Sequence, residues 1–191
     1  MNIMNKKTLA LTIEQYKEII EYMRSGFSGH KPNERIAACL VLEASLGLRI
    51  SDILQLKLND IVSDGGRYRL DIIEKKTDKK RTFTVPMAIY DYIELYCYKH
   101  KIKPDERIFP ITERAVQKQL RIVCDYLGLQ GISTHSFRKM FATKIYNNSD
   151  HNIVLVQKLL QHSSPSTTQR YIVISDKQTE EALENHISLL M

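Results

Sequence analysis

The feature that most constrains this chain is a change in hydrophobic period within residues 57–86. Before and after this stretch, apolar residues recur roughly every three or four positions, as on one face of a helix. Inside it, Tyr68, Leu70 and Ile72 alternate with polar residues, and Phe83 and Val85 do the same. Alternation of this kind is typical of half-buried strands. We therefore predict three short antiparallel strands, at 57–62, 67–74 and 81–86.

Turn and cap signals agree with this interpretation. Asp64-Gly65-Gly66 supplies the first turn of the sheet, the lysine-rich run 75–80 supplies the second, and Pro86 ends the last strand. Thr12 to Gln15 has the pattern of a capping box that starts a helix, and a second helix is expected to end near Gly47. Further helices are expected to include 135–147, 151–161, 165–173 and 176–190.

These elements define the predicted fold class, which is mainly α (α+β), with one small three-stranded antiparallel sheet. The 191 residues are 43% hydrophobic and 26% charged, so residues 1–191 are expected to form one packed domain. Cys39, Cys97 and Cys124 are far apart and odd in number, which favours buried thiols over a disulfide or a zinc site. No membrane span or signal peptide is recognisable, and a reducing cytoplasm is expected.

The formal net charge of +6 favours an anionic partner. A long polyanion such as DNA is the commonest partner of a basic domain, although many basic proteins bind nothing acidic. Within the predicted turn, the run Lys75 to Arg81 carries five basic residues in seven positions. A hairpin tip is also where solvated lysines are ordinarily found, so the run alone does not identify a function.

Each candidate functional residue has an ordinary structural explanation when it is considered alone. Arg49 follows Gly47-Leu48 and could be a surface residue, and His135 and Arg138 share one helix face simply because they are three apart. His162 could cap a helix. Tyr171 is one of ten tyrosines, most of which serve packing.

Their order along the chain favours a functional interpretation. Residues 47–56 resemble the first arginine box of the tyrosine recombinase (phage integrase) family, and a lysine-tipped hairpin follows. Residues 135–143 contain that family's His-x-x-Arg box, and residues 159–171 resemble its histidine-to-tyrosine box. The resemblance covers roughly residues 10–185. It implies a DNA breaking-rejoining fold and six catalytic residues: Arg49, Lys76, His135, Arg138, His162 and Tyr171.

The resemblance also implies a role for each residue. Tyr171 would attack the scissile phosphorus and form a 3′-phosphotyrosyl ester, while the two arginines would hold the phosphate oxygens. Lys76, with Lys79 as the alternative, would protonate the leaving 5′-oxygen. His135 would assist proton transfer at the tyrosine, and His162 would donate to a phosphate oxygen. No cofactor and no metal are expected, and Asp52 is interpreted as a helix cap (with Ser51, of a short helix through Leu56) or an arginine partner.

Some positions depart from the family pattern. Gln161 stands where glycine usually precedes the second histidine, Lys139 stands where histidine often follows the second arginine, and Phe137 replaces a common leucine. The chain also has no room for the N-terminal DNA-clamping (core-binding) domain of most integrases. It would thus be a short recombinase similar to fimbrial phase-variation enzymes, a transposon or phage integrase, or a fragment.

The expected partners are double-stranded DNA, further copies of the chain in a tetramer on DNA, and accessory DNA-bending proteins. The predicted C-terminal helix carries Leu183, Ile187 and Leu190 on one face, which would dock on a neighbouring protomer or on its own core. Two other functions remain open at this point. One is a catalytically silent DNA-binding regulator derived from a recombinase, and the other is a type IB topoisomerase-like enzyme that relaxes supercoils.

Overall fold

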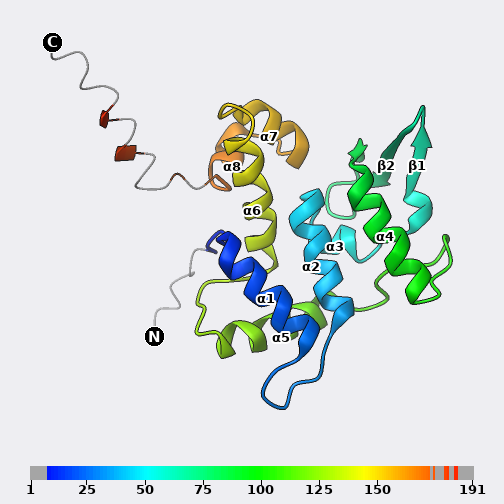
Figure 1. Cartoon of the computed structure of the whole chain (residues 1–191). Helices are drawn as coiled ribbons and strands as arrows, with labels where there is room; N and C mark the ends of the chain where they lie inside the picture. The colour runs from blue at the N-terminus through cyan, green and yellow to red at the C-terminus, as the bar shows by residue number, and fades with distance from the viewer. Residues whose placement is uncertain (1–7, 173, 175–178, 181–182, 185–191) are drawn as a thin grey trace, which may run out of the picture.

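The computed structural model describes residues 8–172, 174, 179–180 and 183–184, and its elements are shown in Figure 1. Helices dominate and one sheet lies among them, as the sequence predicts. The elements in chain order are α1 (Ile13–Ser25), α2 (Glu34–Leu46), α3 (Ile50–Ile53), the 3-10 helix η1 (Leu58–Asp60), β1 (Ile61–Asp64), β2 (Arg67–Ile73), β3 (Lys80–Val85), α4 (Met87–Lys99), α5 (Glu113–Tyr126), α6 (Thr134–Asn147), α7 (Ile153–Leu160) and α8 (Pro165–Gln169).

The predicted sheet is confirmed, with three antiparallel strands in the order β1-β2-β3. Leu70 lies opposite Ile61 on one side and Phe83 on the other, and it is fully buried. Gly65 and Gly66 join β1 to β2 with φ values of +58° and +82°. A two-residue hairpin turn of type I′ needs such left-handed backbone at both positions, which is why the turn carries two glycines.

The first strand is shorter than predicted, because residues 58–60 form η1 instead of extended chain. The carboxylate of Asp60 accepts a hydrogen bond of 2.7 Å from the backbone N–H of Lys57. A local side-chain bond of this kind competes with strand pairing. β1 therefore begins only at Ile61.

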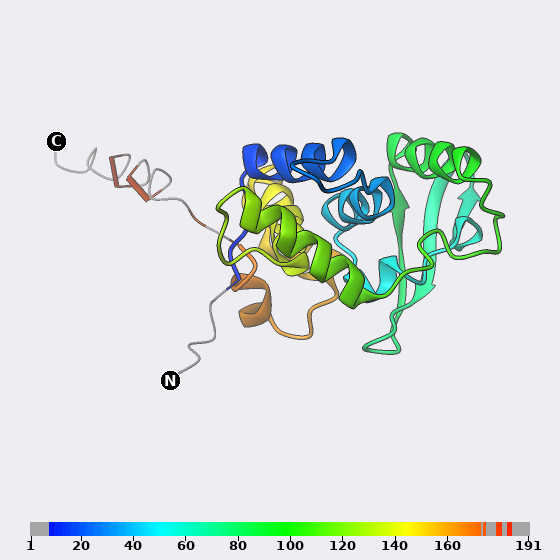
Figure 2. The ribbon, with the colours of Figure 1, turned by 90° about the horizontal axis from the view of Figure 1, so that it is seen from below.

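Helix α4 covers one face of the sheet, as the view from below in Figure 2 shows. The rings of Tyr68 on β2 and Tyr90 on α4 stack with centroids 3.6 Å apart. On the other side of the molecule α2 lies at the centre of the helices, where it packs against α1, α3 and α6. The sheet with α4 and the helical part share one hydrophobic core.

The three cysteines are buried, as predicted. Burial raises the pKa of the Cys97 and Cys124 thiols to about 11, so both stay protonated at neutral pH. Their contribution is therefore packing. Within the described part of the chain, each helix falls short of the length and hydrophobicity that spanning a bilayer requires.

A second, smaller cluster of buried side chains lies where α6 meets α7 and α8. Phe141, Ala142, Val156 and Leu160 form it, and Tyr171 packs against it. Pro165 occupies the first turn of α8, as expected for a helix start. The predicted C-terminal helix 176–190 lies outside the described residues, apart from 179–180 and 183–184.

The short helix after the first arginine differs from its prediction. It spans Ile50–Ile53 with Arg49 as its N-cap, so Ser51 and Asp52 lie inside it and do not cap it. Asp52 is buried, and its Oδ1 accepts a hydrogen bond of 2.9 Å from the backbone N–H of Lys75. Asp52 is thus not a helix cap. Among the described residues it makes no ion pair with an arginine; burial raises its pKa, although the positive charges of Arg49 and Arg138 act in the opposite direction. Asp52 attaches α3 to the turn between β2 and β3.

Candidate active site

Tyr171 lies just after α8. The helix predicted over 165–173 would have placed it about two turns inside a helix, and this prediction is wrong. The helix ends at Gln169, in a segment of serine and threonine residues with weak helix propensity. The backbone of Tyr171 is nevertheless fixed: its N–H donates to the Thr168 carbonyl at 2.9 Å, and its carbonyl accepts from the Thr143 hydroxyl at 3.3 Å. The tyrosine is therefore held from two sides against α6.

The ring of His162 lies beside that of Tyr171, with centroids 4.6 Å apart and an interplanar angle of 58°. His162 follows α7, and its Nδ1 lies 3.1 Å from the hydroxyl oxygen of Thr168. Burial lowers the pKa of His162 to about 4, with the charges of nearby arginines acting in the same direction. At neutral pH the imidazole is therefore uncharged and can donate a hydrogen bond through one nitrogen.

Gln161, which stands where the family usually has glycine, adopts left-handed backbone with φ +52° and ψ +39°. This is the C-cap conformation that glycine adopts without steric cost. Here the side-chain amide donates a hydrogen bond of 3.0 Å to the carbonyl of Lys80 on β3. The substitution thus preserves the turn before His162 and attaches it to the hairpin.

Arg138 is almost completely buried, with 1% exposure. It lies in the second turn of α6 and not in the first, because the helix begins at Thr134. Its guanidinium donates to the carbonyl of Gly47 and, at 2.8 Å, to that of Leu160, and its Cζ lies 6.0 Å from the centre of the Tyr171 ring. Burial, followed by the charges of nearby arginines, lowers the pKa of Arg138 to about 10, so it remains charged at neutral pH.

Gly47 ends α2 in left-handed conformation, with φ +59°. A Cβ at this position would lie 2.3 Å from the ring of Phe141, so only glycine fits. The Gly47 carbonyl accepts from both Arg138 and Arg81. The C-terminal end of a helix favours cations, and here it receives two.

Arg49 occupies the N-cap position of α3 without a side-chain capping bond, and 18% of its side chain is exposed. Its Nη1 donates to the carboxylate of Glu74 at 2.5 Å. Glu74 is fully buried and also accepts from Arg81 and Thr77. Burial by itself would raise the pKa of Glu74, but these three hydrogen bonds outweigh it and lower the pKa, so the carboxylate stays ionised.

Arg81 is a member of this centre that the sequence reasoning missed. Its place at the end of the run 75–81 suggests a solvated residue of the hairpin tip, but its exposure is 1%. Its guanidinium donates to Glu74 at 2.9 Å and to the Leu159 carbonyl at 2.6 Å. Its position in β3 could have revealed it, because it is in phase with the apolar residues Phe83 and Val85.

Lys76 and His135 lie at the exposed side of the centre. Lys76 is in the turn between β2 and β3, and His135 is in the first turn of α6. Partial burial lowers the pKa of His135, and the charges of Arg138, Lys76 and Arg49 lower it further. The six predicted residues, from four separate parts of the chain, therefore converge on one region, with Lys76 at its edge.

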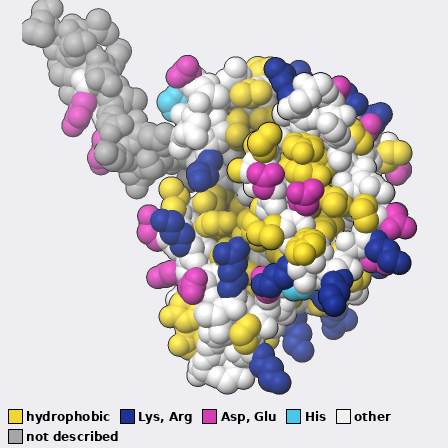
Figure 3. Space-filling view, turned by 45° about the vertical axis from the view of Figure 1, so that its right-hand side comes forward, with side chains coloured by type: hydrophobic (Ala, Val, Ile, Leu, Met, Phe, Trp, Pro, Cys, Tyr) yellow, Lys and Arg dark blue, Asp and Glu magenta, His cyan; other side chains and the backbone are white. Residues whose placement is uncertain are grey.

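A groove of about 610 Å³ begins at His162 and continues beside the hairpin. Its lining includes Lys79, Lys80, Lys158 and Gln161. On the face seen in Figure 3, basic side chains are mixed with acidic and hydrophobic ones. The groove is thus a local concentration of positive charge next to the candidate site.

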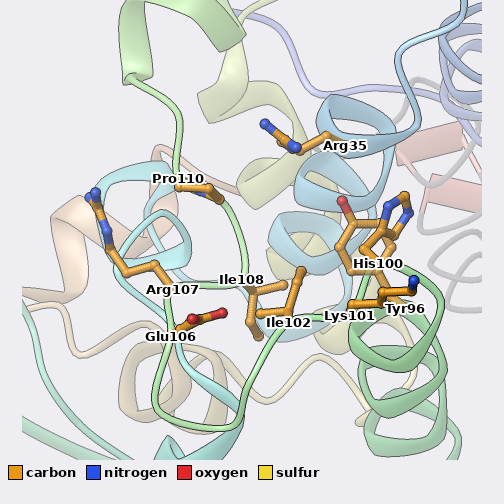
Figure 4. Close-up of a pocket in the computed structure, with 9 residues that line it drawn as sticks. All are labelled: Arg35, Tyr96, His100, Lys101, Ile102, Glu106, Arg107, Ile108 and Pro110. Carbon is orange, nitrogen blue, oxygen red and sulfur yellow. The ribbon is translucent and has the colours of Figure 1, made fainter.

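A separate pocket of about 460 Å³ lies between the start of α2 and the end of α4. Figure 4 shows Arg35, Tyr96, His100 and Arg107 around it. None of the six predicted residues lines this pocket. Among the described residues, no group of three or more His, Cys, Asp or Glu side chains is arranged to hold a metal ion.

Comparison with known proteins gives a consistent result. The model of the Phage integrase family matches residues 10–178. The probable integrase/recombinase YoeC of Bacillus subtilis is 31% identical over 178 residues, which cover 90% of this chain and 92% of YoeC. The tyrosine recombinase XerC of Caldanaerobacter subterraneus is 30% identical, over 92% of this chain and 50% of XerC.

Solved structures show the same fold. The XerH site-specific recombinase in its post-cleavage complex with palindromic difH substrate has a TM-score of 0.74 at 24% identity, over 96% of this chain and 54% of that chain. A lambda integrase dimer bound to a COC′ core site has a TM-score of 0.65 at 19% identity, over 86% and 48%. At these identities the likeness concerns the fold alone.

The fold and the matched relatives define the class, which is the catalytic domain of a tyrosine recombinase. The chain belongs to the Phage integrase family. It spans nearly the whole of YoeC but only about half to two thirds of the Xer recombinases that it matches.

Proposed function

We propose that this chain cuts and rejoins double-stranded DNA at specific sites by transesterification, with Tyr171 as the nucleophile. The phenolic oxygen bonds to the scissile phosphorus while the bond from phosphorus to the 5′-oxygen breaks. The products are a 3′-phosphotyrosyl ester and a 5′-hydroxyl, and a 5′-hydroxyl of another strand reverses the step. Because the ester conserves the energy of the phosphodiester, no nucleotide cofactor is required.

The observation that carries this proposal is the setting of Tyr171. A phenol has a reference pKa of about 10 and is a weak nucleophile at neutral pH, so it needs cations and a proton acceptor nearby. The Tyr171 ring lies 4.6 Å from the ring of His162 and 6.0 Å from the Arg138 guanidinium carbon. Two residues that precede Tyr171 by 9 and 33 positions in the sequence, His162 and Arg138, therefore lie beside one phenol.

The two arginines would stabilise the negative charge that builds on the phosphate oxygens during attack. Arg49 is partly exposed and can meet a phosphate without moving far. Arg138 donates to two backbone carbonyls. These bonds use two of its five N–H donors, and among the described residues its Nε makes no hydrogen bond. The side chain is almost completely buried, so we infer that DNA binding gives a phosphate access to Arg138.

The remaining residues would manage protons. Neutral His162 can donate to a phosphate oxygen, and its pKa of about 4 keeps it uncharged at neutral pH. The lowered pKa of His135 makes it a proton acceptor for the phenol at neutral pH. Lys76, with Lys79 as the alternative, would protonate the leaving 5′-oxygen. Because arginines supply the positive charge, we propose that no metal ion takes part.

The DNA backbone would follow the lysine-lined groove beside His162, because a groove with one sign of charge concentrates a polyanion. The XerH and lambda integrase structures named above are complexes with DNA, which supports DNA as the partner. We further propose that residues 1–191 act as a single catalytic domain. It would assemble as a tetramer on DNA, aided by DNA-bending proteins, and its C-terminal segment would dock on itself or on a neighbour.

A suicide oligonucleotide, nicked so that the cleaved end diffuses away, tests the proposal. The wild-type chain should form a DNA-shifted band on denaturing electrophoresis, and a chelator should leave that band unchanged. Tyr171→Phe should abolish the band while DNA binding in a mobility-shift assay persists. Tyr146→Phe is the matched control, because Tyr146 packs against the same small cluster.

The outcomes separate the alternatives. An adduct that survives in Tyr171→Phe identifies a different nucleophile. Binding without any adduct in the wild type indicates a catalytically silent regulator. Relaxation of supercoiled DNA without strand exchange between two sites indicates a type IB topoisomerase-like enzyme.

A further inference from the structure

Glu74 immediately precedes the lysine-bearing turn, and its carboxylate joins three side chains. Oε2 accepts from Arg49 at 2.5 Å and from the hydroxyl of Thr77 at 2.8 Å. Oε1 accepts from Arg81 at 2.9 Å. The side chain has no exposed surface, so these bonds are shielded from competing water.

The backbone groups of Glu74 and Lys75 are also hydrogen-bonded. The N–H of Glu74 donates to the Lys79 carbonyl at 3.0 Å, and the Glu74 carbonyl accepts from Asp78 at 2.9 Å. The N–H of Lys75 donates to Asp52 on α3 at 2.9 Å. The turn that carries Lys76 is therefore attached to the segment that carries Arg49 through both Glu74 and Asp52.

We propose that Glu74 is a positioning residue that holds the lysine turn and Arg49 in a fixed relation. The proton donor of the turn would then face the leaving oxygen of the phosphate that Arg49 binds. This inference rests on the function proposed above. Glu74 itself touches neither substrate nor reacting atoms in this role, and acts through Arg49 and Thr77.

The geometry favours a Glu74 that positions Arg49 over a Glu74 that blocks the access of Arg49 to a phosphate. Arg49 makes a single hydrogen bond to protein among the described residues, through Nη1, whereas a guanidinium carries five N–H donors. Its side chain retains 18% exposure while Glu74 has none. The carboxylate therefore fixes one side of Arg49 and leaves other donors for a phosphate. Arg81, which is fully buried, donates a hydrogen bond to the other oxygen of Glu74, Oε1.

The test compares two suicide substrates that differ in one atom. In the second substrate the bridging 5′-oxygen is replaced by sulfur, and a thiolate leaves without a proton because thiols have pKa values near 8.5. Cleavage of this substrate no longer depends on the lysine. Thr77→Val, which removes only the hydroxyl link to Glu74, should slow cleavage of ordinary DNA about tenfold and leave the sulfur substrate unaffected.

Glu74→Gln should slow ordinary cleavage about 10²-fold, since it loosens both the turn and Arg49, and the sulfur substrate should restore part of that loss. Arg49→Ala is the control for a residue on the phosphate, and it should remain slow on both substrates. Equal losses on the two substrates for Thr77→Val and Glu74→Gln would show a merely structural role and overturn the inference. So would unchanged rates.

Hydrogen exchange supplies a readout that does not require activity. In both variants the amides of residues 75–79 should exchange faster than in the wild type, while those of α2 and α6 should be unchanged. Unaltered exchange in the turn would overturn the coupling whatever the cleavage results. A wild-type chain that forms no adduct with either substrate would instead refute the proposed function, and exchange would then decide the role of Glu74 alone.

Discussion

Gln161 donates a hydrogen bond through its side-chain amide to the backbone carbonyl of Lys80, and this bond joins the end of α7 to the start of β3. Gln161 also has a positive φ of 52°, a conformation that costs a residue with a Cβ about 1 kcal/mol. The hydrogen bond contributes about 1 kcal/mol in the opposite direction. The two effects nearly cancel at this position.

This balance predicts how substitutions of Gln161 behave. Gln161→Gly relieves the backbone cost but loses the bond, so its free energy of unfolding should stay within about 0.5 kcal/mol of wild type. Gln161→Ala keeps the cost and loses the bond, and should be about 1 kcal/mol less stable. Urea denaturation measures both. Equal stability of the two variants would contradict the role assigned to the left-handed backbone.

The lowered pKa of His162 predicts a pH dependence of stability. The imidazole titrates at about 4 in the folded chain and at 6.5 in the unfolded one. Between these values the unfolded chain binds more protons, so stability is complete above pH 6.5 and falls as the pH drops toward 4. After allowance for partial exposure, the loss should be on the order of 1–2 kcal/mol.

Denaturation curves at pH 7.5 and pH 4.5 for wild type and His162→Gln measure this loss. The variant should lose less stability than the wild type over the same interval, because glutamine does not titrate. Parallel behaviour of the two proteins would show that His162 is not held neutral by its surroundings.

Arg81 and Arg69 lie in the same sheet but should respond very differently to substitution by methionine. Arg81→Met leaves the buried Glu74 short of a partner and should cost about 3–5 kcal/mol. Arg69 pairs with Asp64 at the surface, with 42% and 57% exposure, and Arg69→Met should cost at most about 1 kcal/mol. Urea midpoints at constant m-value measure the difference. Comparable losses of stability in the two variants would contradict the role assigned to the buried ion pair of Arg81 and Glu74.

The lysine groove predicts how DNA binding depends on salt. Each lysine that contacts a phosphate releases a counterion, so Lys158→Gln should reduce the slope of log affinity against log salt concentration by about 1. Lys99→Gln is the matched control, since Lys99 is bound to Glu34 at the end of α4. Titrations at several salt concentrations decide the matter, and equal slopes for the two variants would exclude the groove as the path of the DNA.

The sequence predicted the sheet because its alternating apolar residues, such as Leu70 and Phe83, must share a face. It also singled out six candidate residues that lie in one region of the structure. It gave no sign that Glu74 is buried, and the phase of Arg81 with Phe83 and Val85 was its one indication that Arg81 is buried. Charged residues next to lysines normally indicate a solvated turn, and only the folded chain shows that their charges compensate each other. The early end of α8 was missed for a similar reason, since periodicity does not report where weak helix propensity stops a helix.

The single peptide group of Gly47 receives hydrogen bonds from a guanidinium of the sheet and from one of α6. If that peptide plane rotated, both arginines would lose an acceptor at the same moment. A substitution that displaces this carbonyl would therefore lower both the stability of the fold and the rate of DNA cleavage. Screens that select variants for expression level would discard the substitutions that report most directly on how Arg138 is held.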